Sequence, residues 1–189
     1  MGDDGLALPF PARIGRDLAA LASDVPVSFM HGNRDFLVQE RFARDTGVQL
    51  LPDPTLIDLY GTPTVLMHGD TLCIDDRTYQ AFRAQVRDPG WQRRTLGLPI
   101  EQRIALARGM RDLSDNAKHG KPMEIMDVTP AEVERVFAAT GAELMIHGHT
   151  HRPARHVHDG RVRWVLPDWY EGGGYLEASP AGIRAVEAP

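Results

Sequence analysis

The chain has 189 residues, 42% of them hydrophobic and 25% charged, a composition typical of a globular protein with a sizeable core. Its 21 basic and 26 acidic side chains give a net charge of −5, so we expect no nucleic-acid partner bound through overall charge. No apolar run approaches the ~18 residues of a membrane span. The acidic start Met1-Gly2-Asp3-Asp4 is unlike a signal peptide, and the single cysteine, Cys73, fits a reducing cytoplasm.

Basic side chains are concentrated in one segment. Residues 83–121 carry a net charge of +5, so the rest of the chain carries −10. One interpretation is a solvated helical face, and the other is a surface that binds phosphates or an anionic membrane.

Helical and extended patterns alternate in the first part of the chain. In order, they predict a helix over 12–23, a buried strand over 26–30, a helix over 36–46 ended by Gly47, an extended stretch over 48–60 and a second buried strand over 65–67.

The second part begins with a mostly helical region over 76–118, broken at 89–90 and at 97–99. Thr129 as N-cap, Pro130 at N1 and Glu132 at N3 predict a helix that ends at Gly141. A third buried strand is expected over 144–146, and β-hairpins over 154–187 with turns at 159–160, 172–174 and 180–182.

Each of the three buried strands runs into a glycine-containing loop with polar side chains. Strands that alternate with helices predict an α/β layer fold, in which ligands bind beyond the carboxyl ends of the strands. Imidazoles and an amide oxygen suit divalent ions such as Mn, Fe or Zn. The side chains expected to converge at one sheet edge are Asn33, Arg34, Asp35, His68, Asp70, His149 and His151.

The order of these motifs, Gly32-Asn33-Arg34-Asp35, then His68-Gly69-Asp70, then Gly148-His149-Thr150-His151, resembles that of the calcineurin-like metallophosphoesterases. The longer strings over 31–37, 67–73 and 146–153 are similar to those of the UDP-2,3-diacylglucosamine pyrophosphatases within that superfamily. The resemblance implies a four-layer αββα sandwich, a single domain over 1–189 and an inserted helical lid over 76–121.

The resemblance also implies an activity. Enzymes of this family hydrolyse UDP-2,3-diacylglucosamine to UMP and 2,3-diacylglucosamine 1-phosphate (lipid X) in lipid A biosynthesis, with two Mn²⁺ ions. Two close cations neutralise phosphoryl oxygens and activate a water for in-line attack. The lid would accept acyl chains and rest on an anionic membrane, which places the protein in the cytoplasm, peripheral on the inner membrane.

Site residues are carried over motif by motif. The positions that match metal ligands are Asn33, His68 and His149 for one ion, and His151 for the other. Arg34 matches the catalytic residue that stabilises charge on the phosphoryl group. Substrate contacts are implied for Asn33, Arg34, Asp76, Ser114, Lys118, Lys121 and His149.

Two family motifs have no counterpart in these residues. No histidine follows an aspartate by two positions, and the bridging Gly-Asp with its Leu-Phe-Glu continuation is absent. The resemblance places Met1 just after the family's first two βα units, so a truncated chain with at most one ion and little activity is expected. The alternatives are a phosphoesterase for another nucleotide and a non-catalytic module that binds the lipid nucleotide.

Other polar residues have simpler interpretations. His31 and His147 are expected to be structural, His156 and His158 to face solvent on a hairpin, and Cys73 to be a small buried residue. Asp75 and Asp76 would also serve as N-caps of the following helix. The apolar residues of the lid segment would equally form ordinary core.

Overall fold

The computed structural model describes residues 2–118, 125–170 and 172–188, and the side chains described in the longest helix end at Asp112. The chain divides into two compact units. The first contains residues 1–52 and 77–122, and the second contains residues 53–76 and 123–189.

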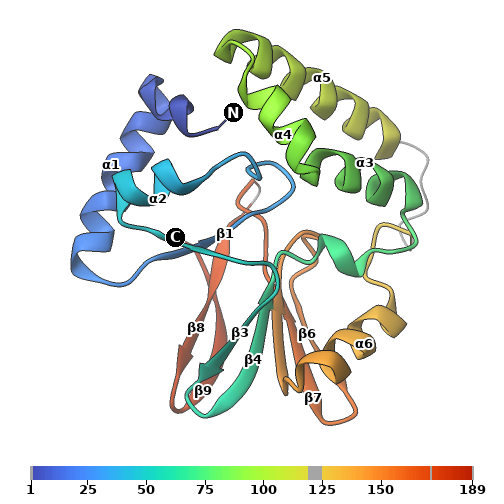
Figure 1. The fold of residues 1–189 in the computed structure, drawn as a ribbon. Coiled ribbons are helices and arrows are strands. Elements are labelled where there is room, and N and C mark those ends of the chain that lie inside the picture. Colours follow the sequence, from blue (N-terminus) through green and yellow to red (C-terminus); the bar gives the residue numbers. More distant parts are fainter. Residues whose placement is uncertain (1, 119–124, 171, 189) are drawn as a thin grey trace. The chain divides into compact units, whose positions relative to one another are not determined.

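The first unit is mainly helical, with a small parallel sheet (Figure 1). Its elements are η1 (Asp3–Ala7), α1 (Pro9–Asp24), β1 (Ser28–Met30), α2 (Glu40–Thr46), β2 (Gln49–Leu51), α3 (Arg77–Arg87), α4 (Pro89–Leu96) and α5 (Ile100–Lys118). Strand β1 pairs in parallel with β2 and is partly exposed, not buried as predicted.

The helix predicted over 36–46 begins only at Glu40. The preceding residues form a turn instead, because Asp35 Oδ1 accepts from the Gly32 amide at 2.5 Å and the Asp35 carbonyl accepts from the Val38 amide at 2.9 Å. The predicted end is confirmed, since Gly47 has the left-handed φ of 71° that ends α2.

The predicted helical region is confirmed, with its second break at 97–99, but the first break lies at Asp88 and not at 89–90, because Pro89 and Gly90 begin α4. Pro89 occupies the first turn of α4, and the Asp88 side chain accepts from the Trp91 amide at 2.7 Å as the N-cap. The residues 97–99 separate α4 from α5. Arg103 of α5, which is 4% exposed, donates to both carboxylate oxygens of Asp4 and so ties η1 to α5.

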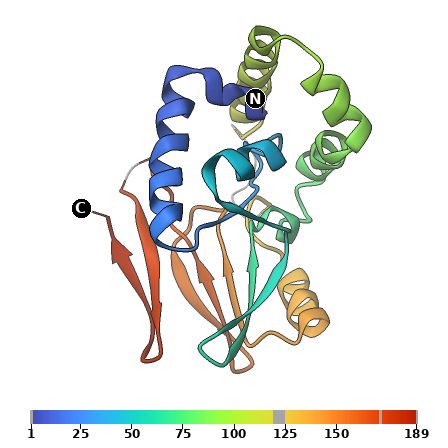
Figure 2. The same ribbon diagram turned by 60° about the vertical axis from the view of Figure 1, so that its left-hand side comes forward.

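The second unit contains a five-stranded mixed sheet in the order β3-β4-β5-β7-β6. Its strands are β3 (Thr55–Leu59), β4 (Thr62–Met67), β5 (Leu144–His147), β6 (Ala154–His158) and β7 (Arg161–Val165). The pairs β4–β5 and β5–β7 are parallel, and the other two are antiparallel. The hairpin of β8 (Gly174–Ser179) and β9 (Gly182–Glu187) forms a separate ribbon, shown in Figure 2.

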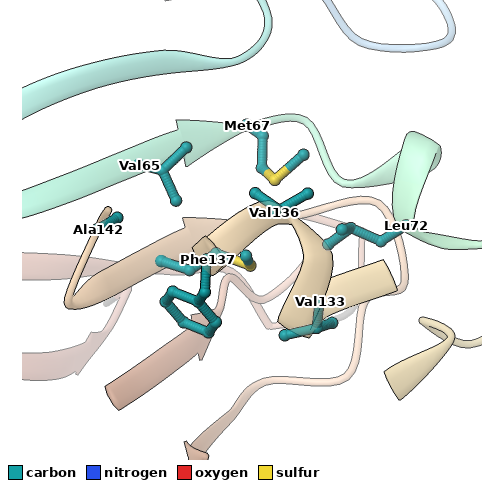
Figure 3. Close-up of a cluster of buried hydrophobic side chains, with 8 residues drawn as sticks. Val65, Met67, Leu72, Val133, Val136, Phe137 and Ala142 are labelled. Atoms are coloured by element: carbon teal, nitrogen blue, oxygen red, sulfur yellow. The ribbon is translucent and has the colours of Figure 1, made fainter. Parts of the chain in front are cut away.

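Helix α6 (Pro130–Thr140) covers this sheet and forms the core of the unit with it. Figure 3 shows Val133, Val136 and Phe137 of the helix against Val65 and Met67 of β4. Thr129 precedes the helix as predicted, but its hydroxyl donates to Asp75 Oδ2 at 2.8 Å instead of capping the first turn.

Of the three strands predicted to share one sheet edge, two do so. Strands β4 and β5 are adjacent and parallel, whereas β1 belongs to the separate sheet with β2. The turns at 159–160 and 180–182 join the predicted hairpins, but Gly174 begins β8 instead of forming a turn. In the described part of the chain, no helix is both long and apolar enough to cross a membrane.

Candidate metal-binding site

Two of the sequence motifs meet at the carboxyl ends of β4 and β5. The last paired residues of these strands are Met67 and His147, and both chains then enter glycine-containing loops. The Gly148 amide donates to the His68 carbonyl at 2.9 Å. The rings of His68 and His149 lie 5.0 Å apart between centroids, inclined at 70°. Two of the three predicted metal ligands of the second unit, His68 and His149, are therefore brought together.

Gly69 permits the two loops to approach this closely. Its φ is +108°, and a Cβ added there would lie 2.7 Å from Nδ1 of His147 and 3.0 Å from the carbonyl oxygen of Gly148. The backbone oxygen and the buried ring have little freedom to move, so the motif His68-Gly69-Asp70 requires glycine at its centre.

The backbone at His149 is strained. Its φ is +66°, and the Thr150 amide donates to the Gly148 carbonyl at 2.8 Å across it. An i→i+2 hydrogen bond around a residue with positive φ defines the rare, strained form of the γ-turn. Such conformations persist where neighbouring contacts hold them, and they are frequent at functional sites. This turn aims the His149 ring toward His68.

His147 lies beneath the turn and is fully buried. Its Nδ1 lies 2.9 Å from the Gly148 carbonyl, and its Nε2 lies 3.0 Å from Nη1 of Arg163. Burial lowers the pKa of His147 to about 4, so the ring is neutral at physiological pH. The predicted structural role of His147 is consistent with these contacts.

The fourth imidazole of this region, His151, is more exposed. Its φ is +54°, and its Nδ1 lies 4.0 Å from Oδ2 of Asp168. The Tyr170 ring lies 6.2 Å from the His151 ring. A carboxylate near one ring nitrogen of a histidine is the usual means of orienting the other nitrogen toward a metal. The sequence offered no signal for Asp168.

In the first unit, the loop after β1 carries Asn33 and Arg34. His31 Nε2 lies 2.6 Å from the Val38 carbonyl, which supports the predicted structural role of that histidine. Arg87 of α3 donates to the Gly32 carbonyl at 2.9 Å, a contact that the sequence did not reveal. Arg34 is exposed and Asn33 is half-buried.

The remaining predicted substrate contacts are distributed over both units. Asp76 is half-buried and directly precedes α3 in the chain, within the second unit. Ser114 and Lys118 lie in the last turns of α5, where side chains are not described, and Lys121 lies outside the described residues.

Two predictions about single residues can be compared with the structure. Cys73 is 2% exposed, and burial raises its pKa to about 12, so it is the small buried residue predicted and has no thiolate character. His156 and His158 are half-buried, which contradicts the prediction that they face solvent. His158 Nε2 accepts from Arg163 Nε at 3.3 Å, and its Nδ1 lies 3.5 Å from Glu134, because β6 and β7 turn these side chains toward α6.

The donors at this sheet edge fit a divalent ion of intermediate softness. Neutral imidazoles are preferred ligands of Mn, Fe and Zn, and His68 and His149 supply two of them side by side. Within the ranges the structure describes, no group of three or more His, Cys, Asp or Glu side chains is arranged to hold a metal. Two imidazoles do not complete a metal site, so an ion bound here would need further ligands.

The chain is similar to known proteins over most of its length. The family model of the calcineurin-like phosphoesterases matches residues 1–153. A UDP-2,3-diacylglucosamine hydrolase of Xanthomonas campestris pv. campestris (strain B100) is 46% identical over 92% of this chain and 80% of its own length. Those of Aromatoleum aromaticum and Chromobacterium violaceum are 48% and 46% identical, over 96% and 97% of this chain and 76% and 77% of their own lengths.

The chain belongs to the calcineurin-like phosphoesterase family, which makes it a metal-dependent hydrolase with the α/β fold of that family. The three relatives named above are UDP-2,3-diacylglucosamine hydrolases. The fold and the enzyme class expected from the sequence are confirmed.

Proposed function

We propose that this chain hydrolyses the pyrophosphate bond of UDP-2,3-diacylglucosamine, giving UMP and 2,3-diacylglucosamine 1-phosphate in lipid A biosynthesis. The observation that carries the proposal is the His68–His149 pair at the β4–β5 edge, in a chain 46–48% identical to hydrolases named for this substrate.

The proposed ligand set extends beyond this pair. Asn33 joins His68 and His149 at one ion, and His151 belongs to a second. Divalent ions, with Mn²⁺ proposed, neutralise charge on phosphoryl oxygens and activate water when bound. Asp168 favours one orientation of the His151 ring, because its carboxylate lies 4.0 Å from Nδ1.

The other proposed roles belong to groups that bind the substrate. The exposed guanidinium of Arg34 presents a planar fork of donors that suits phosphoryl oxygens and the charge that grows on them in the transition state. Asp76, Ser114, Lys118 and Lys121 are proposed substrate contacts.

The segment 76–121, with helices α3, α4 and α5, is proposed as the lid over the acyl chains. Arg93, Arg94 and Arg108 are exposed there, as are Leu98 and Leu106 at 38% and 37%. Exposed cations beside exposed apolar side chains fit the surface of an anionic membrane. A peripheral position on the cytoplasmic face of the inner membrane is proposed on this basis.

One observation favours a rival function. Because the described residues bring two imidazoles together and no third ligand of the His, Cys, Asp or Glu kind, a module that binds the lipid nucleotide without cleaving it is the second candidate.

The test is an assay for UMP in saturating Mn²⁺ with UDP-2,3-diacylglucosamine. It compares residues 1–189 with a longer chain in which a segment carrying the Asp-x-His and Gly-Asp motifs precedes Met1. We expect Mn²⁺-dependent UMP release by the longer chain and its loss in His149→Ala, with His156→Ala as the matched control.

Binding of the lipid nucleotide by the longer chain without UMP release would contradict the proposal and favour the binding module. Faster release from a diadenosine polyphosphate would favour a phosphoesterase for another nucleotide. Residues 1–189 alone are expected to turn over slowly. A rate within about tenfold of the longer chain would contradict only this last expectation.

A further inference from the structure

Arg163, in the centre of β7, is a buried cation with unusual partners. It is 5% exposed. Its Nη1 lies 3.0 Å from Nε2 of His147, and its Nε lies 3.3 Å from Nε2 of His158. Among the residues the structure describes, no carboxylate oxygen lies within ion-pairing distance of it. A guanidinium is buried at considerable cost, so a position that places it against two imidazole rings calls for an explanation.

The guanidinium determines which nitrogen of His147 carries the proton. Arginine only donates hydrogen bonds, so the Nε2 of His147 that faces it must be the acceptor. The single proton of the neutral ring then sits on Nδ1, where it is donated to the Gly148 carbonyl at 2.9 Å. With the other tautomer, both contacts would fail at once.

The Gly148 carbonyl is in turn the closing acceptor of the strained turn. It receives the Thr150 amide at 2.8 Å as well as the His147 ring, so two donors fix the peptide before His149. The amide of the same glycine is bound to the His68 carbonyl. An unbroken series of hydrogen bonds therefore joins Arg163 to the backbone that aims His149.

We propose that Arg163 is a positioning residue, which holds His149 in its metal-binding orientation by fixing the tautomer of His147. The inference rests on the proposed function only in treating His149 as a metal ligand. Arg163 itself touches neither the substrate nor the ions in this proposal.

The variants separate this role from general support of the core. Arg163→Met removes the donors and keeps an unbranched side chain. Arg155→Met makes the same change at an exposed position of the neighbouring strand β6. His147→Phe keeps a ring and removes both nitrogens. The double variant His147→Phe/Arg163→Met completes a double-mutant cycle, which measures the coupling between the two residues.

The first readout is the ¹⁵N spectrum of the His147 ring in the metal-free protein. We expect the proton on Nδ1 in the wild type and in Arg155→Met, and a mixture of tautomers in Arg163→Met. A wild-type ring protonated on Nε2 overturns the proposal, and this holds even if Arg163→Met does not fold.

The second readout is hydrogen exchange at the Thr150 amide, corrected for any change in global stability measured with urea. We expect exchange at least about tenfold faster in Arg163→Met and unchanged in Arg155→Met. In His147→Phe, adding Arg163→Met should not accelerate exchange further, because the hydrogen bonds that join Arg163 to the Gly148 carbonyl through His147 are already lost. If the accelerations caused by His147→Phe and Arg163→Met multiply in the double variant, the two residues act independently on this amide and the proposal is overturned.

The third readout is Mn²⁺ affinity, followed by electron paramagnetic resonance. We expect Arg163→Met to lower it about tenfold, the lower end of the effect of removing a direct partner of a metal-binding histidine, because Arg163 acts through His147 and the Gly148 peptide. Loss of affinity in His149→Ala but not in Arg163→Met overturns the positioning role. If affinity is unchanged in both, the proposed metal site fails, and the tautomer and exchange results alone decide the role of Arg163.

Discussion

At the scale of single residues, Gly69 lets the loops that follow β4 and β5 approach each other closely, because glycine has no Cβ. Its φ of +108° and the 2.7 Å from its would-be Cβ to the His147 ring impose both backbone strain and overlap on any other residue. We predict that Gly69→Ala lowers the free energy of unfolding by roughly 3 kcal/mol, measured by urea denaturation.

Gly160 provides the matched control. It has a φ of +83° in the β6–β7 turn, but a Cβ there would meet nothing within 4 Å. Gly160→Ala should cost only the strain, about 1–2 kcal/mol. Equal costs at the two positions would show that the overlap at Gly69 is relieved by movement of the loop.

The buried imidazole of His147 predicts a particular pH dependence of stability. Burial lowers its pKa to about 4, below the ordinary 6.5 of an unfolded chain, so the unfolded state takes up the proton first. The contribution of His147 to the free energy of unfolding is complete above about pH 6.5 and is lost as the pH falls toward 4. Urea denaturation of the metal-free protein should show up to about 3 kcal/mol of loss over this range.

His147→Phe removes this group and should flatten the profile between pH 6.5 and 4. A profile with the same slope in the variant would assign the effect to another residue. Burial also lowers the pKa of His156, so His156→Phe is the informative comparison.

Individual residues mark the limit of sequence reasoning at this scale. The pattern of motifs identified His68 and His149 as partners, because adjacent parallel strands carry them to one edge. It missed Arg163, since an arginine in a hairpin strand reads as a surface residue until the partners across the sheet are known. The inward-facing position of His158 was missed for the same reason.

At the scale of elements, a charged pair joins η1 to α5. The Arg103 side chain is 3% exposed and Asp4 is 51% exposed, and the pair is bidentate. Asp4→Asn leaves a buried guanidinium without its counter-charge, so we predict a loss of about 1–3 kcal/mol in urea denaturation.

The exposed pair Arg41–Asp45 on α2 is the control, with 59% and 47% exposure. Asp45→Asn should cost less than about 0.5 kcal/mol, since exposed i,i+4 pairs contribute little. The hydrogen bond from Arg103 also lowers the pKa of Asp4, so its contribution is present at neutral pH and lost only in acid, as the pH falls through that lowered pKa. Equal losses in the two variants would contradict a special role for Arg103.

Helix ends were the most predictable elements, because their signals are local. Gly47 and Gly141 end α2 and α6 as predicted, because each adopts a left-handed backbone conformation. The start of α2 was predicted too early, because the Asp35 carboxylate holds the preceding turn through the Gly32 amide. The assignment of β1 to a different sheet from β4 and β5 depends on long-range pairing, which no local pattern encodes.

For the whole molecule, the uneven distribution of charge is the feature most open to test. Residues 83–121 are basic and the rest of the chain is acidic. Not all of this charge is available, since Arg87 is bound to the Gly32 carbonyl and Arg103 to Asp4. The exposed Arg93 and Arg94 at the end of α4 are the side chains through which an anionic surface would act.

If this segment rests on a membrane, the chain should bind anionic vesicles in a salt-sensitive manner. Each engaged arginine contributes about 1 kcal/mol at low salt, so neutralising Arg93 and Arg94 to Gln should lower the partition coefficient roughly thirtyfold. The control is the same double change at Arg13 and Arg16 on α1, which are also exposed and lie outside the basic segment. Vesicle sedimentation at two salt concentrations measures the partition coefficient of each double variant and its dependence on salt. Equal partitioning onto neutral and anionic vesicles would contradict the electrostatic contribution, and an equal effect of the two double variants would show that binding follows net charge and not the proposed lid.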